Sequence, residues 1–74
     1  MTALPIVSGN QCILALQRLG YKITRTRGSH VRMNCPGRVP VTVPKHAELD
    51  RGTLGNIIRT TNISIDQFKN LLKK

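Results

Sequence analysis

The stretch YKITRTRGSHVRMNCPGRVPVTV, residues 21–43, decides the fold that this sequence predicts. Apolar and polar residues alternate along it, which is the period of a β-strand with one buried face. In its first part Tyr21 and Ile23 fall on the inner side, and Lys22, Thr24 and Thr26 fall on the outer side. Arg27-Gly28 then stands where a short hairpin turn would reverse the chain.

The rest of this stretch predicts two further strands. In the second strand Val31, Met33 and Cys35 point inward, and His30, Arg32 and Asn34 point outward. Pro36-Gly37 predicts the next turn, because proline fixes φ at the second turn position and glycine accepts a positive φ at the third. Val39, Val41 and Val43 form the inner row of the third strand. Pro40 and Pro44 cannot donate ladder hydrogen bonds, so we expect this strand at an edge of the sheet.

Helix signals flank the strands on both sides. Ser8 and Gln11 form a capping box for a helix over residues 8–19, which Gly20 ends. Asp50 is placed to cap a second helix, with an apolar stripe of Leu54, Ile57 and Ile58 and an end at residues 60–62. Ser64 and Gln67 repeat the capping signature before a third helix, in which Phe68, Ile65, Leu71 and Leu72 face inward. We therefore expect one α+β domain over residues 1–74, of order α-β-β-β-α(-α), with a three-stranded antiparallel meander whose apolar face the helices cover.

Positive charge dominates the composition and indicates a polyanionic partner. The chain has 74 residues, with 12 Lys and Arg against 3 Asp and Glu, and a formal net charge of +9. Residues 1–47 contain no acid at all. Such a field concentrates polyanions at the surface, so nucleic acid is the first expected partner, an acidic protein the second and an anionic membrane the third. With only Tyr21 and Phe68 as aromatic residues, base-stacking platforms are nearly excluded.

The remaining composition predicts a cytoplasmic protein without a cofactor. No apolar run approaches the roughly 20 residues of a membrane span, and no basic region leads into an apolar signal stretch. Cys12 and Cys35 lie far apart, without the spacing of a zinc site, and are expected to be reduced thiols. We expect no bound metal, because no paired carboxylates stand ready to hold one: Glu48 and Asp50, the nearest two acids, sit in the connector after the third strand.

Five short phrases stand in order along the chain: Leu19-Gly20-Tyr21, Arg27-Gly28-Ser29-His30, Val41-Thr42-Val43-Pro44, Gly52-Thr53-Leu54 with Ile57-Ile58-Arg59, and Ile63-Ser64 before Phe68. Together they span about residues 8–72 and resemble the HicA toxin family, the mRNA interferases of bacterial toxin–antitoxin pairs. The resemblance implies a fold like that of double-stranded-RNA-binding domains, an endoribonuclease activity on mRNA, and a cognate HicB-type antitoxin that covers the catalytic face.

By the same resemblance His30 is the catalytic residue, and its position agrees with that chemistry. Cleavage of RNA without a metal needs a base for the 2′-OH proton, and an imidazole, with an ordinary pKa near ~6.5, serves at neutral pH. Cations around it would stabilise the negative charge that develops on phosphorus. We therefore expect the RNA-binding residues to be Arg32, Arg27 and Lys22, with the backbone amides of Gly28 and Ser29 as neutral donors.

Other interpretations of the same residues remain open from the sequence. The chain could be a non-catalytic RNA-binding module, or a basic adaptor for an acidic protein. The general acid that protonates the leaving oxygen could be water, Lys22 or the same histidine in a second step. His46 is expected to be a loop residue. Arg25 is in register with Tyr21 and Ile23, so we expect it at the sheet margin with its stem packed. Arg18 is expected on a solvated helix face.

Overall fold

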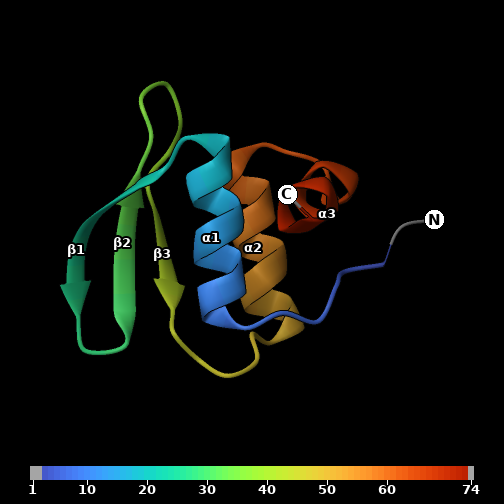
Figure 1. The fold of residues 1–74 in the computed structure, drawn as a ribbon, viewed down its shortest axis with the longest axis horizontal. Coiled ribbons are helices and arrows are strands. Elements are labelled where there is room, and N and C mark those ends of the chain that lie inside the picture. The colour runs from blue at the N-terminus through green and yellow to red at the C-terminus, as the bar shows by residue number, and fades with distance from the viewer. Residues whose placement is uncertain (1–2, 74) are drawn as a thin grey trace.

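The computed structural model describes residues 3–73, in which two helices lie against one face of a three-stranded antiparallel sheet and a third helix packs on the first (Figure 1). The elements are α1 (Gly9–Leu19), β1 (Lys22–Arg27), β2 (His30–Asn34), β3 (Val41–Pro44), α2 (Arg51–Thr61) and α3 (Ile65–Lys73). The strand order is β1-β2-β3, so β3 lies at an edge. The predicted fold class and element order are confirmed.

The helices begin and end at the residues whose side chains favour caps. The Ser8 hydroxyl accepts from the Gln11 amide (3.1 Å), and the Gln11 side chain accepts from the Ser8 amide (2.8 Å). Gly20 ends α1 at φ 122°, a left-handed value that favours glycine. Ser64 and Gln67 form the same reciprocal pair at the start of α3, at 3.0 and 2.9 Å. The capping boxes predicted from the sequence are confirmed.

Asp50 caps α2 and is charged in that role. Its carboxylate accepts from the Thr53 hydroxyl at 2.6 Å and from the Thr53 amide at 3.0 Å. These hydrogen bonds lower the pKa of the Asp50 carboxyl below its usual value, since they favour the ionised form. One of the three acids of the chain is thus used to begin a helix.

Two arginines outside the sheet hold the ends of helices. The Arg18 guanidinium on α1 donates to the Leu71 carbonyl (2.6 Å) and the Leu72 carbonyl (3.3 Å) near the end of α3. The Arg38 guanidinium donates to the Thr61 carbonyl (2.7 Å) at the end of α2. Both satisfy carbonyl groups that a helix leaves unpaired. Arg18 is exposed on its helix as expected, but its hydrogen bonds to α3 were not predicted, because sequence spacing does not show that α1 passes the end of α3.

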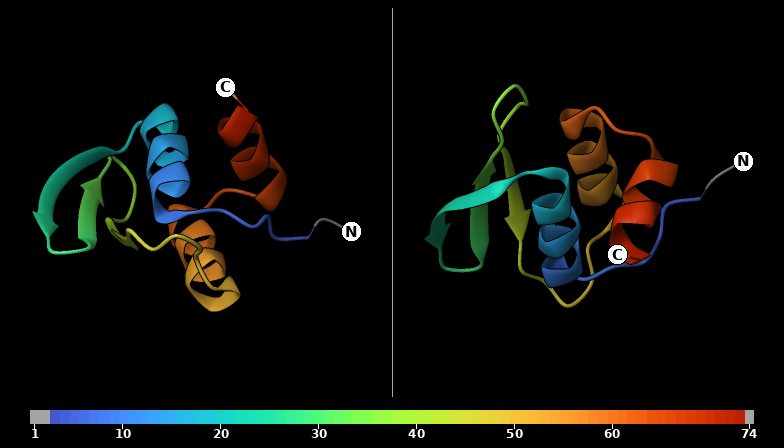
Figure 2. Two further views of the ribbon diagram at one scale, coloured as in Figure 1. Left: turned by 60° about the horizontal axis from the view of Figure 1, so that its bottom comes forward. Right: turned by 45° about the horizontal axis from the view of Figure 1, so that its top comes forward.

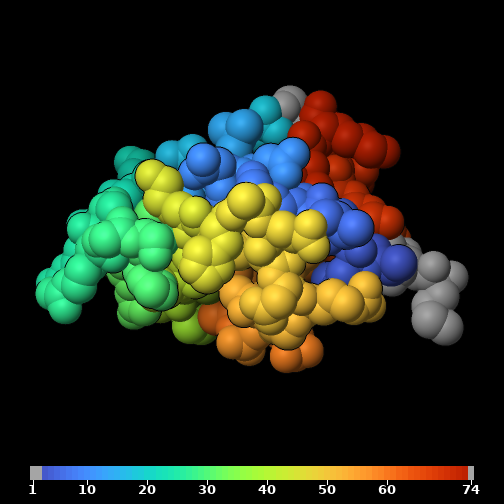
Figure 3. All heavy atoms as spheres, turned by 90° about the horizontal axis from the view of Figure 1, so that it is seen from below, coloured from blue at the N-terminus to red at the C-terminus, as the bar shows by residue number. Residues whose placement is uncertain are grey.

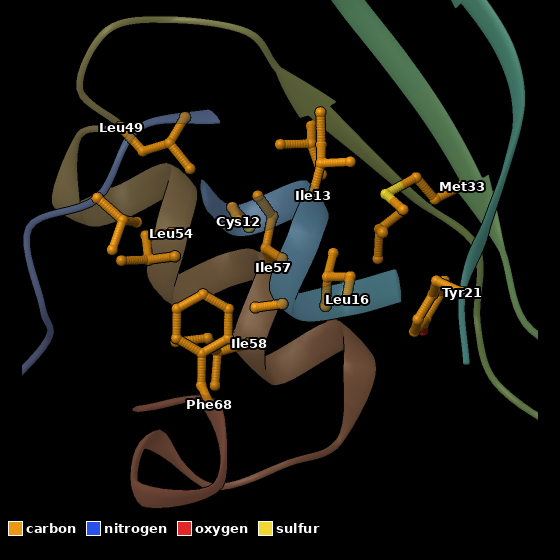
Figure 4. Packing of buried hydrophobic residues seen from close by; sticks show 14 of the residues in the cluster. Cys12, Ile13, Leu16, Tyr21, Met33, Leu49, Leu54, Ile57, Ile58 and Phe68 are labelled. Atoms are coloured by element: carbon orange, nitrogen blue, oxygen red, sulfur yellow. The ribbon is translucent and has the colours of Figure 1, made fainter. Parts of the chain in front are cut away.

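The core lies between the helices and the inner face of β2 and β3 (Figure 4). Its fully buried members include Leu16 and Cys12 of α1, Leu54 of α2, Phe68 of α3 and Met33 of β2. Strand β1 lies farthest from the helices in every ribbon view and pairs with β2 alone (Figures 1 and 2). Its six residues are all exposed. Strand β1 therefore extends beyond the core, whereas the inner face of β2 is part of it.

Two apolar residues of the expected inner rows are exposed, and the extent of the sheet explains both. Ile23 faces the inner side but is 46% exposed, because β1 extends past the helices. Val39 is 59% exposed and precedes β3, whose pairing with β2 begins only at Val41. The turn at Pro36-Gly37, with φ 80° at Gly37, is confirmed. The prediction of Val39 as part of the inner row was wrong.

A β-bulge at Thr24 changes the face on which the rest of β1 presents its side chains. Ile23 pairs with Met33 and Arg25 pairs with Arg32, so two steps along β1 match one step along β2. Because directly paired residues share a face, Arg25 lies on the outer face with Arg32. Thr26, opposite Val31, turns to the inner side. The predictions for Arg25 and Thr26 were wrong, since strict alternation cannot anticipate an inserted residue.

Candidate nucleic-acid interface

The outer face of the sheet is hollowed, and the hollow is lined by basic and polar side chains. It has a volume of about 600 Å³ and is open to solvent. We call it the basic hollow; its lining residues are Thr24, Arg25, Arg27, His30, Arg32, Asn34 and Thr42. All three strands contribute to it, with the β1–β2 hairpin supplying six of the seven residues. The sheet face opposite the core therefore carries a single concave surface of positive charge.

His30 enters the basic hollow because of the tight turn before it. Gly28 and Ser29 alone connect the paired residues Arg27 and His30. Gly28 has φ 59° whereas Ser29 has a negative φ, as in a hairpin turn that requires glycine at its first central position. His30 is thus the first residue of the central strand, flanked across the sheet by Arg27 on β1 and Pro44 on β3. Its side chain is exposed on the outer face.

Arg32 lies one outward position further along β2, and its orientation is held by a neighbouring strand. It pairs with Thr42 on β3, and its guanidinium donates to the Thr42 hydroxyl at 3.2 Å. On the other side the Thr24 hydroxyl lies 3.4 Å from both the Arg32 carbonyl and the Asn34 side-chain oxygen. The polar residues of the basic hollow thereby support its strands, while most of its guanidinium donors remain available to a ligand.

No acid lines the basic hollow, so its charge is uncompensated within the part of the chain that the structure describes. Glu48 and Asp50 lie between β3 and α2, and Asp66 lies in the first turn of α3. In Figure 3 the connector of residues 45–50 (yellow) separates the hairpin (green) from α2 (orange). Three arginines that share a water-exposed concavity with an imidazole form an attractive site for phosphate groups.

The predicted site residues fall into two groups. The structure brings His30, Arg27 and Arg32 together in the basic hollow. Gly28 and Ser29 form the hairpin tip outside the lining, and the Ser29 carbonyl accepts from the Lys45 amide at 2.7 Å. Lys22 is on the outer face opposite Asn34, at the end of β1 away from the tip, and does not line the basic hollow either.

Arg25 lines the basic hollow because of the bulge, although it was not among the predicted site residues. No pattern in the sequence marks Thr24 as the inserted residue, so only the strand register reveals it. Thr24 and Asn34 were expected on the outer face, and Thr42 alternates with the buried Val41 and Val43, but none of the three was predicted to belong to the site. His46 lies in the connector, away from the lining.

Other kinds of site find little support among residues 3–73. No three His, Cys, Asp or Glu side chains gather there as a cluster able to hold a metal ion. Both cysteines are free; Cys12 is buried, and burial raises the pKa of its thiol to about 12, so it is a neutral core residue. No helix within these residues has the length and apolar character needed to cross a membrane.

Comparison with known proteins agrees with the resemblance seen in the five sequence phrases. The family model of the HicA toxin of bacterial toxin–antitoxin systems matches residues 9–63. This range runs from the start of α1 through the whole sheet and α2, and it includes every residue of the basic hollow. No curated protein matches the chain. Since the match covers about three quarters of the 74 residues, the chain belongs to the HicA family, the toxins of toxin–antitoxin pairs that act with a cognate antitoxin.

Proposed function

We propose that this toxin is a metal-independent endoribonuclease, an mRNA interferase, in which His30 is the general base. The observation that supports this most strongly is the presence of one imidazole and three guanidinium groups in a single open hollow without an acid. Neutral imidazole accepts protons near neutral pH, and guanidinium groups bind phosphate oxygens with paired hydrogen bonds.

In the proposed reaction the RNA backbone lies in the basic hollow with a phosphodiester beside His30. The imidazole takes the proton of the adjacent 2′-OH, and the 2′-oxygen attacks phosphorus. The bond from phosphorus to the 5′-oxygen then breaks, and the leaving oxygen takes a proton from water or from the imidazolium in a second step. Arg27, the cross-strand partner of His30, stabilises the extra negative charge of the phosphorane, and Arg32 binds the RNA backbone beside it.

The lack of carboxylates in the lining of the basic hollow supports a mechanism that does not depend on a metal ion. Catalysis by bound Mg²⁺ relies on carboxylate oxygens that hold the ion beside the phosphate. All seven residues of the basic hollow lack a carboxylate, and Asp50 binds Thr53 on the helical side of the molecule. The arginines would supply the positive charge that a metal ion supplies elsewhere.

The proposed antitoxin is a HicB-type protein with an acidic surface that covers the basic hollow. Complementary charge speeds encounter and orients the complex. Such a partner would remove the RNA site from solvent, which accounts for inhibition without any change inside the toxin. The outer face of the hairpin is exposed and therefore accessible to a macromolecule of either kind.

A single assay separates this proposal from the competing functions. Labelled single-stranded RNA is incubated with the purified toxin in excess EDTA and analysed on denaturing and native gels. We expect RNA fragments, because no step of the proposed reaction requires a divalent ion. A mobility shift with intact RNA would instead support a non-catalytic RNA-binding module. Neither cleavage nor a shift would favour a basic adaptor that binds only an acidic protein.

A further inference from the structure

The bulge at Thr24 has a consequence for the substrate, because it brings a third arginine to the outer face. Without the inserted residue, Arg25 would point inward with Ile23. With it, Arg25 stands directly opposite Arg32 and lines the basic hollow. Bulges often redirect a side chain beside a functional site. The register of β1 is therefore the feature that gives the hollow its full charge.

The pairing of Arg25 with Arg32 opposes folding stability. Like charges placed directly across two strands destabilise a sheet. Neither guanidinium has a carboxylate partner among residues 3–73, and the hydrogen bond from Arg32 to the Thr42 hydroxyl adds no negative charge. An arrangement that costs stability in the free protein is explained when a ligand supplies the missing anion.

The outer residues of the hairpin form two rows across the strands. One row contains Arg27 and His30, and the other contains Arg25 and Arg32. Outward positions along β2 are two residues apart, so the rows are separated by roughly 7 Å. Neighbouring phosphates along an RNA strand have a comparable separation, so a single backbone running along β2 would meet both rows in turn.

We propose that Arg25 and Arg32 form a second phosphate subsite, which binds the backbone phosphate next to the scissile phosphate beside His30. This inference rests on the proposed function for the identity of the ligand, but it concerns binding and not the cleavage step. It makes the substrate an RNA segment with at least two consecutive phosphates, and it makes Arg25 a positioning residue for the scissile bond.

The test measures binding of a single-stranded oligonucleotide with 2′-O-methyl riboses, which the proposed chemistry cannot cleave. Its dissociation constant is determined at several salt concentrations for wild type, Arg25→Ala and Arg25→Lys. The matched control is Arg51→Ala, which removes the same charge from an exposed position at the start of α2 that does not line the basic hollow. We expect Arg25→Ala to reduce the salt slope by about 0.7–1, the value for one lost phosphate contact, and Arg25→Lys to restore it.

Two further measurements distinguish a phosphate subsite from a structural role. Without RNA, the Tm of Arg25→Ala at low salt should be equal to or above that of wild type, since a repulsive pair is removed. In a double-mutant cycle, Arg25→Ala and Arg32→Ala should weaken binding less together than the product of their separate effects, because they share one phosphate.

An Arg25→Ala variant whose affinity and salt slope equal those of Arg51→Ala would overturn the subsite, as would independent effects of Arg25 and Arg32. These outcomes are separate from those of the cleavage assay. A toxin that binds the oligonucleotide through Arg25 but leaves ordinary RNA intact would contradict the nuclease proposal and keep the subsite. A toxin that cleaves RNA, and whose Arg25→Ala variant binds the oligonucleotide as Arg51→Ala does, would support the nuclease proposal and contradict the subsite.

Discussion

Replacement of His30 by alanine is expected to abolish RNA cleavage, with a loss of about 10²–10⁴-fold in rate, the usual contribution of a general base. The substitution removes the only imidazole of the basic hollow and leaves its arginines in place. RNA affinity should therefore stay near that of wild type, because the phosphate contacts persist. The measurement is the initial rate of fragment formation together with a binding curve on 2′-O-methyl RNA.

The control for this experiment is His46→Ala, which removes the other imidazole of the chain from the exposed connector. It should cleave RNA as wild type does. The free energy of unfolding of His30→Ala should differ from that of wild type by no more than about 0.5 kcal/mol, since an exposed side chain contributes little to packing. Cleavage at the wild-type rate by a folded His30→Ala variant would remove His30 from the mechanism.

Replacement of Gly9 by alanine is expected to cause a large loss of stability. A Cβ atom at this position would lie 2.0 Å from the Pro44 carbonyl oxygen and 2.8 Å from the Lys45 Cα. Both are backbone atoms, so no side-chain rotation relieves the clash. The Gly9 amide also donates to the His46 carbonyl at 2.9 Å, which ties the start of α1 to the chain after β3. This close approach sets the position of α1 against the sheet.

Overpacking of this kind costs about 1–3 kcal/mol, and an unyielding backbone contact places Gly9→Ala at the upper end. A chain of this length has roughly 4–11 kcal/mol of stability in all, so the loss should be plain in a urea unfolding curve. Gly55→Ala is the matched control: its Cβ meets only the Leu4 Cδ1 at 3.8 Å, inside α2. It should gain about 0.5–1 kcal/mol. Equal stability of the two alanine variants would contradict the described contact between α1 and β3.

The helix starts and the turns of the fold follow from local signals in the sequence. Ser8, Asp50 and Ser64 satisfy amides within three residues of themselves, so their helix starts depend on no distant contact. The turn at Gly37 likewise depends on a local preference for positive φ. The exposure of individual side chains is less predictable from the sequence. Ile23 has the pattern of an inward residue, but whether the inner side is covered depends on how far the helices extend over the sheet.

The candidate site could be predicted only as far as strand alternation holds. His30 and Arg32 follow an undisturbed alternation on β2, and both lie on the outer face as expected. Arg25 follows the bulge and was assigned to the opposite face. In the sequence nothing distinguishes Arg18 and Arg38 from arginines that could bind RNA. In the structure both donate hydrogen bonds to helix carbonyls more than twenty residues away. Such long-range contacts depend on packing, which spacing along the chain does not specify.

Activation of a 2′-OH by the His30 imidazole is tested most directly by the chemistry of the RNA ends. Fragments formed by wild type in excess EDTA should carry 2′,3′-cyclic phosphates and 5′-hydroxyl groups, and His30→Ala should form none. The same sequence made as DNA should stay intact, because it lacks the nucleophile. Fragments with 5′-phosphate ends, or cleavage that appears only when Mg²⁺ is restored, would contradict this mechanism.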